Sequence, residues 1–223
     1  MIYTLIRSKR KTLALYVRNG DIEVRAPLRM SKREIEKFIT SKQKWILDNI
    51  KKQNQRENQR DKFHLDYGGT VLCRGRSYLV TAKTGSRASF DDEHFYVPAD
   101  LTQEQIKQAC VKIYRKIAKQ ELTDRTHGYS KLLSVTPAAV KINSAKSRWG
   151  SCSAKKSINY SWRLIMADDE VIDYVVVHEL AHIIELNHSI RFWAIVENIF
   201  PNFRERKKRL KELQTRLNNE DWD

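Results

Sequence analysis

The fold is decided by residues 171–193, which read VIDYVVVHELAHIIELNHSIRFW. The stretch contains His-Glu-x-x-His at His178, Glu179 and His182, followed by a further histidine at His188. On a helix, residues four apart share a face, so His178 and His182 point the same way, as two ligands of one metal ion must. The carboxylate of Glu179 then lies beside that site. This spacing is typical of two metal ligands and a general base on one helix.

The last histidine of the stretch indicates a catalytic metal site. His188 follows His182 at the offset of the third ligand in the signature H-E-x-x-H-x-x-G-x-x-H. Three histidines with one open position describe a catalytic zinc site, whereas structural sites have four protein ligands. Because Glu185 replaces the glycine of that signature, we expect the helix to continue for about one more turn and stop at Asn187, which tolerates a left-handed exit. Ser189 is then the cap of a new helix.

The competing interpretation is that these histidines are ordinary core residues. Tyr174–Val177 and Ile183–Ile184 make the helix apolar on nearly all sides, which predicts a buried helix capped by Asp168. A buried helix does not accept imidazoles and carboxylates without a compensating charge. The metal site is therefore the favoured hypothesis.

The formal net charge of +15 on 223 residues is unevenly distributed. Residues 1–62 hold 17 Lys and Arg against 7 Asp and Glu, and a second basic run lies between Arg204 and Lys211. Such a surface either attracts nucleic acid, nucleotides or acidic proteins, or is simply solvated, and both interpretations stay open. Aromatic residues are not interleaved with the basic runs in the way that base stacking requires.

The three cysteines and the N-terminus indicate a cytoplasmic protein. Cys73, Cys110 and Cys152 are odd in number and far apart, which predicts free thiols in a reducing compartment. The N-terminal apolar run is too short for a signal peptide, and no stretch approaches the roughly 18–20 apolar residues of a membrane span. We therefore expect no membrane partner.

The periodicity predicts an α+β fold with two regions. Residues 1–100 are expected to form a β-rich N-terminal region with a helix over 31–50. Residues 101–223 are expected to form a zincin-like catalytic region, in which a mixed or antiparallel sheet packs on the His-Glu-x-x-His helix. These regions are either separate or one continuous domain.

The N-terminal region begins with a strong hairpin signal. Apolar and polar residues alternate over 13–17 and 22–26, with Asn19-Gly20 as a type I′ turn between them. Ser31 and Glu34 form a capping box for the helix that follows. The polar residues 51–62 are either a linker or an exposed helix end.

The rest of the chain predicts two more hairpins, a long helix and three strands. Thr102 and Gln105 form a capping box for a helix to about Thr126, with Gly128 as its C-cap, and we expect this helix to pack on the catalytic one. The hairpins cover residues 71–82 and 90–97; the strands cover 139–143, 147–151 and 158–164; a basic amphipathic helix follows Pro201.

Several motifs together resemble those of the YgjP-like metallopeptidases, a family related to the WLM and SprT-like zincins. They are Ser147–Ser153, Ile158–Asn159, Tyr174–His182, Asn187–Ser189 and Phe192–Trp193, with Arg10–Leu15 and Val24–Pro27 near the N-terminus. The resemblance covers nearly the whole chain, except the polar segment 51–62 and the acidic tail 218–223. It implies hydrolysis of peptide bonds in a polypeptide substrate.

The resemblance also implies a role for each residue of the central motif. His178, His182 and His188 would bind Zn²⁺, and Glu179 would be the general base. The strand 148–152 would lie beside the site, where its backbone offers an edge to an extended peptide.

Residues of that strand are the candidate substrate contacts. Gly150 and Ser151 are two of them, and Arg148 is either a third or a structural residue. Trp149 is expected to fill the core between sheet and helix. Glu185 and Glu197, outside the strand, are candidates to accept a hydrogen bond from a ligand histidine, and Glu197 is alternatively an extra ligand.

Other functions stay open beside the peptidase. Metal-bound water attacks phosphorus as well as carbon, so a nucleotide phosphoanhydride hydrolase (a nucleoside triphosphate pyrophosphatase) is the main alternative. The absence of a Gly-rich phosphate loop disfavours it. A nucleic-acid-associated protease or binder is a further alternative, although the intact Glu179 argues against a binder with an idle metal site.

Overall fold

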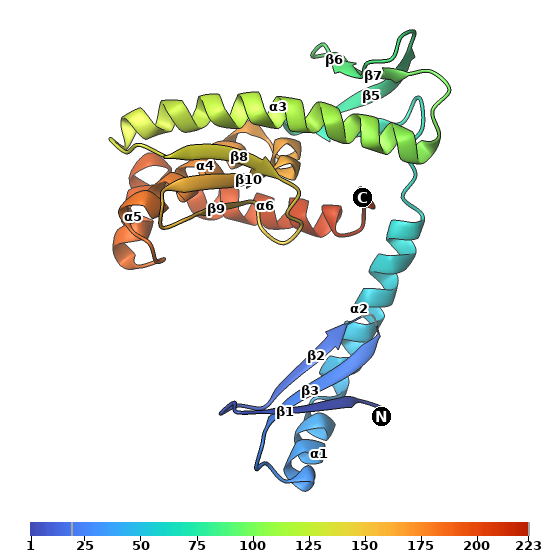
Figure 1. The fold of residues 1–223 in the computed structure, drawn as a ribbon, viewed down its shortest axis with the longest axis vertical. Coiled ribbons are helices and arrows are strands. Elements are labelled where there is room, and N and C mark those ends of the chain that lie inside the picture. Colours follow the sequence, from blue (N-terminus) through green and yellow to red (C-terminus); the bar gives the residue numbers. More distant parts are fainter. Residues whose placement is uncertain (19, 223) are drawn as a thin grey trace. The chain divides into compact units, whose positions relative to one another are not determined.

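The structure, a computed structural model, describes residues 1–18 and 20–222. The chain forms two compact units, each with its own sheet and helices (Figure 1). The first unit holds residues 1–63 and 218–221, and the second holds residues 64–217 and Trp222. No helix within these described residues is long and apolar enough to cross a membrane.

The units divide after Phe63, whereas the sequence placed the division after residue 100. The strands between these positions belong to the second unit because they share a core with its long helix. Tyr114 of that helix donates its hydroxyl to the Leu72 carbonyl over 2.7 Å, and its ring lies 5.1 Å from that of Phe95.

A three-stranded sheet opens the first unit. Strand β3 (Asp21–Pro27) lies in its centre, parallel to β1 (Thr4–Ser8) and antiparallel to β2 (Ala14–Arg18). The predicted hairpin is therefore confirmed, although its turn falls partly on Asn19, which lies outside the described residues. Strand β1 was not predicted.

Two helices follow where one was predicted over residues 31–50. Helix α1 (Lys32–Ser41) begins with the predicted capping box, and helix α2 (Gln43–Asp61) runs on through the polar segment. The prediction of a single helix was wrong. The hydroxyls of Thr40 and Ser41 donate to carbonyls of the preceding turn and so compete with the backbone hydrogen bonds of a continuous helix. The core of the unit consists of Ile22, Val24, Ala26, Ile35, Ile39 and Ile46.

The second unit contains a four-stranded sheet beside a long helix. The strands are β4 (Thr70–Cys73), β5 (Arg76–Lys83), β6 (Ser89–Phe90) and β7 (His94–Pro98), in the order β4-β5-β7-β6. Both predicted hairpins are present in this sheet.

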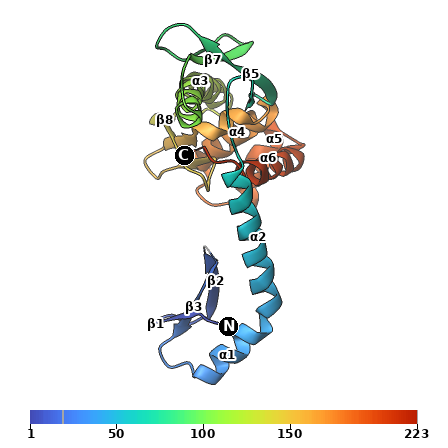
Figure 2. The same cartoon turned by 90° about the vertical axis from the view of Figure 1, so that its right-hand side faces the viewer.

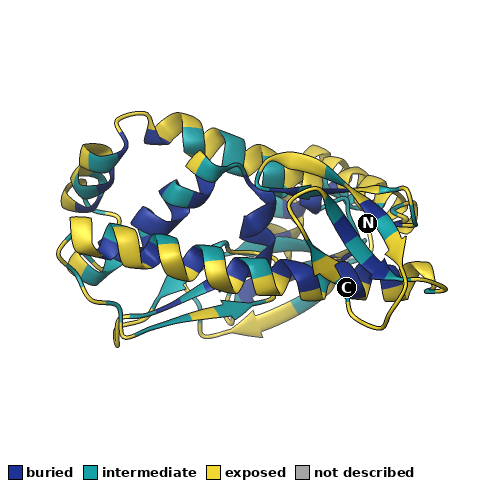
Figure 3. Cartoon of the chain, turned by 90° about the horizontal axis from the view of Figure 1, so that it is seen from above, coloured by how far each residue is buried: buried dark blue, intermediate teal, exposed yellow. Residues whose placement is uncertain are grey.

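Helix α3 (Gln103–Leu132) is longer than predicted. Its capping box at Thr102 is confirmed, but Gly128 lies inside the helix and does not end it. Tertiary packing extends the helix, since the ring of Tyr129 contacts that of Phe200 edge to face at 5.8 Å and Ser130 is buried. Buried and exposed residues alternate along α3, as expected for a helix with one face on the core (Figure 3).

A second sheet of three strands carries the motif region. Strand β10 (Ser157–Ser161) is parallel to β8 (Ala139–Asn143) and antiparallel to β9 (Gly150–Cys152), so the sheet is mixed, as predicted. The strand predicted over 158–164 is shorter because the Ser161 side chain caps a 3-10 helix, η1 (Trp162–Met166). Strand β9 lies at the edge of the order β8-β10-β9.

Three helices complete the unit: α4 (Asp169–Ile184), α5 (Ile190–Ile199) and α6 (Phe203–Leu217). The predicted caps are confirmed, since Asp168 accepts from the Val171 amide and Ser189 from the Phe192 amide. Helix α4 lies next to α3, which Figure 2 shows nearly end-on. The α+β class and the packing of the long helix on the catalytic one are therefore confirmed.

Candidate active site

Three histidine side chains meet at the C-terminal end of α4. His178 and His182 come from the helix, and His188 comes from the segment between α4 and α5. One ring nitrogen of each lies within 4.8 Å of the others, and Nε2 of His188 is 3.1 Å from Nε2 of His178. Nitrogens bound at 2.0–2.1 Å to one tetrahedral ion are about 3.4 Å apart. The cluster therefore has the size of a single metal site.

The chain leaves α4 earlier than predicted. The helix ends at Ile184, and Glu185 is extended (φ −133°, ψ 109°), so the expected left-handed exit at Asn187 was wrong. The carbonyl of Glu185 lies 3.2 Å from Nδ1 of His182. In the tautomer with its proton on Nδ1, His182 donates to this carbonyl and keeps the lone pair of Nε2 for an ion. Glu185 thus supports the site through its main chain.

Aromatic rings of α5 and α6 surround the three imidazoles. Trp193 stacks on His188 with a centroid distance of 5.6 Å, and the buried Phe192 lies 4.5 Å from the ring of His182. Phe203 in turn stacks on Trp193 at 5.1 Å. These rings pack against the imidazoles, of which that of His188 belongs to an exposed residue. Sequence reasoning assigned no role to Phe192 and Trp193, because spacing alone does not show which rings face a metal site.

Burial favours the neutral forms of His178 and His182. Burial, together with the neighbouring His182 and His188, lowers the pKa of His178 to about 3. Burial also lowers the pKa of His182. Neutral imidazoles have a free lone pair at neutral pH, which is the form that a metal ion requires. The donor set therefore fits a divalent transition metal such as zinc.

Glu179 is buried against the edge strand β9. Glu179 is only 5% exposed, and its Oε2 has no hydrogen-bond partner among the described residues. A Cβ atom at Gly150 would lie 2.6 Å from both Cγ and Oε1 of Glu179, which no real side chain tolerates. Only glycine at position 150 therefore lets this carboxylate lie where it does.

The missing charge around Glu179 points to a cation. Burial raises the pKa of Glu179 to about 8, which favours the protonated acid at neutral pH. A positive ion close to a carboxylate favours the ionised form instead. A metal ion held by the three histidines would bring a positive charge to the end of α4 that carries this buried carboxylate, whose Oε2 has no hydrogen-bond partner among the described residues.

The YgjP-like metallopeptidase domain family matches residues 11–213, which include both the edge strand and the histidine cluster. The chain belongs to this family. No curated protein matches it.

Solved structures of two archaeal metallopeptidase zymogens resemble part of the YgjP-like chain. Abylysin of Pyrococcus abyssi has 26% sequence identity and a TM-score of 0.39, covering 44% of this chain and 97% of its own. Jannalysin of Methanocaldococcus jannaschii has 25% identity and a TM-score of 0.37, covering 42% of this chain and 95% of its own.

The other predicted site residues of this YgjP-like chain fall into two groups. Gly150 and Ser151 lie in β9 beside Glu179, whereas Arg148 precedes the strand and is exposed. Trp149 is half-buried and is not part of the core, so its predicted filling role was wrong. Its carbonyl instead accepts from the Ser161 amide over 2.8 Å, which joins the segment to the end of β10.

Glu197 is not part of the cluster. Its carboxylate accepts from Arg204 over 3.1 Å, and its side chain is 48% exposed. The expectation that Glu197 supports or joins the metal site was therefore wrong. Glu197 follows the buried Phe192 by five residues, which places it about 140° around α5 from that ring.

Proposed function

We propose that this YgjP-like metallopeptidase depends on zinc and uses Glu179 as its general base. The observation that carries the proposal is the cluster of three imidazole nitrogens within 4.8 Å, with a buried carboxylate on the same helix. Three histidines leave one coordination position for water or substrate, as in catalytic zinc sites. His178, His182 and His188 would hold the ion.

In the proposed reaction, the zinc ion would activate water and Glu179 would transfer the proton. When bound, zinc acts as a Lewis acid and lowers the pKa of a water molecule to about 7. Glu179 Oε2, which has no partner among the described residues, is available to accept a proton from the attacking water. The same oxygen can later deliver this proton to the leaving amide nitrogen. The rings of Phe192 and Trp193 would orient the imidazoles of His182 and His188 through direct ring contacts.

The free edge of β9 is the proposed binding site of the polypeptide substrate. Strand β9 pairs with β10 on one side, and an extended peptide could add on the other through main-chain hydrogen bonds. Because Gly150 touches Glu179, such a peptide would pass directly beside the general base. Gly150 and Ser151 would contact it through their backbone, and the exposed Arg148 through its side chain.

The cysteines support a cytoplasmic location for the protein. Cys73, Cys110 and Cys152 are free thiols, which are typical of the reducing cytoplasm. Nothing in the comparisons favours the alternative of nucleotide phosphoanhydride hydrolysis.

The proposal is tested by metal content and peptide cleavage together. Protein purified without added metal should hold about one zinc per chain by elemental analysis, and His182→Ala should lose it. Glu179→Gln should keep the zinc and lose cleavage of a fluorogenic peptide library by about 10²-fold or more. Glu185→Gln is the matched control, since only the main chain of Glu185 contacts a ligand. Equal cleavage by Glu179→Gln and wild type would refute the role of Glu179.

A further inference from the structure

The second unit also contains a cleft whose lining does not include the three histidines. The cleft, of about 1170 Å³, opens between α3 and the strands β5 and β6. Its lining includes basic and aromatic side chains, among them Arg76, Tyr78, Phe90, Lys112, Lys116 and Lys119. None of them belongs to the histidine cluster.

The cleft has a row of cations along one wall. Lys112, Lys116 and Lys119 share one face of α3 through their helical spacing, and Arg76 faces them from β5. All four are exposed, and no ion pair of theirs occurs among the described residues. Exposed cations without a partner on the protein are available to an anionic ligand.

The acidic residues of the lining do not neutralise this row. Glu121 and Asp169 are already paired with Arg74, at 3.5 Å and 2.9 Å. With Asp92, the lining holds three carboxylates against five Arg and Lys side chains, so its net charge is +2. The cleft therefore has a clear positive excess.

The opposite wall offers aromatic surface. The rings of Tyr78 and Phe90 meet edge to face at 5.1 Å, and Phe90 rests on the buried Phe95 at 4.9 Å. Both rings are half-buried, so they are held by the core and still reach the cleft. Fixed rings stack on a planar ligand without losing much side-chain entropy. The two rings come from different strands, which explains why the sequence showed no interleaving of aromatic and basic residues.

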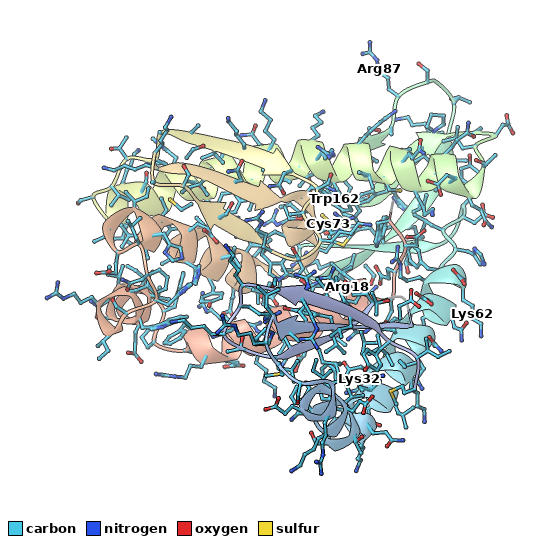
Figure 4. All side chains as sticks on the ribbon, turned by 60° about the horizontal axis from the view of Figure 1, so that its bottom comes forward. Arg18, Lys32, Lys62, Cys73, Arg87 and Trp162 are labelled. Atoms are coloured by element: carbon cyan, nitrogen blue, oxygen red, sulfur yellow. The ribbon has the colours of Figure 1, made fainter. Side chains whose placement is uncertain are left out.

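We propose that this cleft binds a short segment of single-stranded nucleic acid. Its phosphates would follow the lysines, which are successively about 6 Å and about 4.5 Å apart along the axis of α3, and its bases would stack on Tyr78 and Phe90. A duplex keeps its bases stacked internally, so the aromatic wall favours a single strand. Arg87, in the loop between β5 and β6, projects into solvent and adds a positive charge two residues before β6 begins (Figure 4).

The cleft and the candidate active site can be occupied at the same time. Asp169 lines the cleft at the first turn of α4, and His178 follows nine residues later on that helix. Nine residues of α-helix span about 14 Å. The nucleic acid would therefore be recognised at a distance from the metal, and the proposal does not depend on the peptidase chemistry.

The charge contribution is tested by fluorescence anisotropy with a short labelled oligothymidylate and the full chain. Lys112→Glu combined with Lys116→Glu should weaken binding about tenfold or more and reduce the slope of log affinity against log salt by about 1.4. Lys208→Glu combined with Lys211→Glu is the matched control, since both lysines are exposed on α6 and the net charge is the same. It should change the affinity by less than about twofold. An equal loss in both variants would overturn the proposal.

The aromatic contribution separates a nucleic acid from an acidic polypeptide. Tyr78→Leu keeps an apolar side chain against Phe90 and should weaken oligothymidylate binding about fivefold or more. Ultraviolet cross-linking of an iodouracil oligonucleotide should label Tyr78 or Phe90, as mapped by mass spectrometry. Displacement of the oligonucleotide by polyglutamate at equal charge concentration, or tighter binding of a duplex, would overturn the proposal. Circular dichroism confirms that each variant is folded.

Discussion

The two ends of α4 differ in whether their carboxylates are paired with arginines. At the N-terminal end, Asp169 accepts from Arg74 Nε at 2.9 Å and also from Arg125, which donates to Asp173 at 2.7 Å. At the C-terminal end, Glu179 is buried, and its Oε2 has no hydrogen-bond partner in the part of the chain that the structure describes. Charges that only stabilise a fold are paired within the protein, because an unpaired buried charge is costly.

Buried polar atoms without a hydrogen-bond partner indicate which end of α4 holds the candidate active site. Among the described residues, four buried side-chain polar atoms have no hydrogen-bond partner, and one of them is Oε2 of Glu179. Unsatisfied groups persist where a ligand or ion supplies the missing partner. The N-terminal end of α4 is thus expected to control stability, and the C-terminal end to control activity.

The largest expected effect comes from crowding the C-terminal end. Gly150→Ala places a Cβ within 2.6 Å of the Glu179 carboxylate, so Glu179 must move. A displacement of about 1 Å from the productive position costs about 10²-fold in rate. We expect peptide cleavage to fall by that factor while zinc content by elemental analysis stays at the wild-type value.

A second glycine provides the control for this substitution. A Cβ at Gly128, inside α3, would meet nothing within 4 Å. Gly128→Ala should therefore leave cleavage unchanged and stabilise the helix by about 0.5–1 kcal/mol. Wild-type cleavage by Gly150→Ala would mean that the observed position of Glu179 is not the catalytic one.

A smaller effect is expected from unpairing the N-terminal end. The Arg125 side chain is 15% exposed and holds both Asp169 and Asp173. Arg125→Met leaves their carboxylates with fewer donors and should lower the free energy of unfolding by about 2–3 kcal/mol, measured by urea denaturation. Cleavage per folded molecule should not change, because the histidine cluster lies at the other end of the helix.

Arg115→Met is the matched control for Arg125→Met on the same helix. Arg115 is exposed and bonds the Ser144 hydroxyl, so its loss should cost no more than about 0.5 kcal/mol. A large loss of cleavage in folded Arg125→Met protein would break the separation between the two ends of α4.

The start of α4 and the residues of its candidate active site could be predicted from the sequence, because the patterns that indicate them involve only residues close together in the chain. A cap such as Asp168 and the spacing of His178, Glu179 and His182 each depend on a few neighbouring residues. The same holds for the caps at Ser31 and Ser189 and for the alternating strands.

What could not be predicted depends on contacts between distant segments. Gly150 limits Glu179 only because β9 crosses α4, and nothing in the spacing of the two residues shows it. Gly128 looked like a helix end, but the packing of Tyr129 on Phe200 carries α3 past it. The pairing of Arg125 with Asp169 and Asp173 gave no signal in the sequence, because these two residues lie more than forty positions away on α4.

The smallest expected effect is a pH dependence that belongs to the paired end. Burial alone would raise the pKa of Asp169, but hydrogen bonds from Arg74 and Arg125 outweigh it and hold the pKa below its usual value of 3.8. A lowered folded-state pKa stabilises the protein above the unfolded pKa, and this contribution is lost as the pH falls through the folded value. Wild type should therefore lose more stability than Asp169→Asn between about pH 5 and pH 3.

Urea denaturation across that pH range measures the difference. Protonation of the histidine cluster and loss of metal in acid affect wild type and Asp169→Asn alike, so the difference between them isolates the pairing at Asp169. Asp124→Asn, at an exposed α3 residue that accepts from the Gln120 side chain, should follow wild type. If Asp169→Asn also follows wild type, the arginines at this end contribute packing and not charge, and the contrast between the two ends of α4 would rest on Glu179 alone.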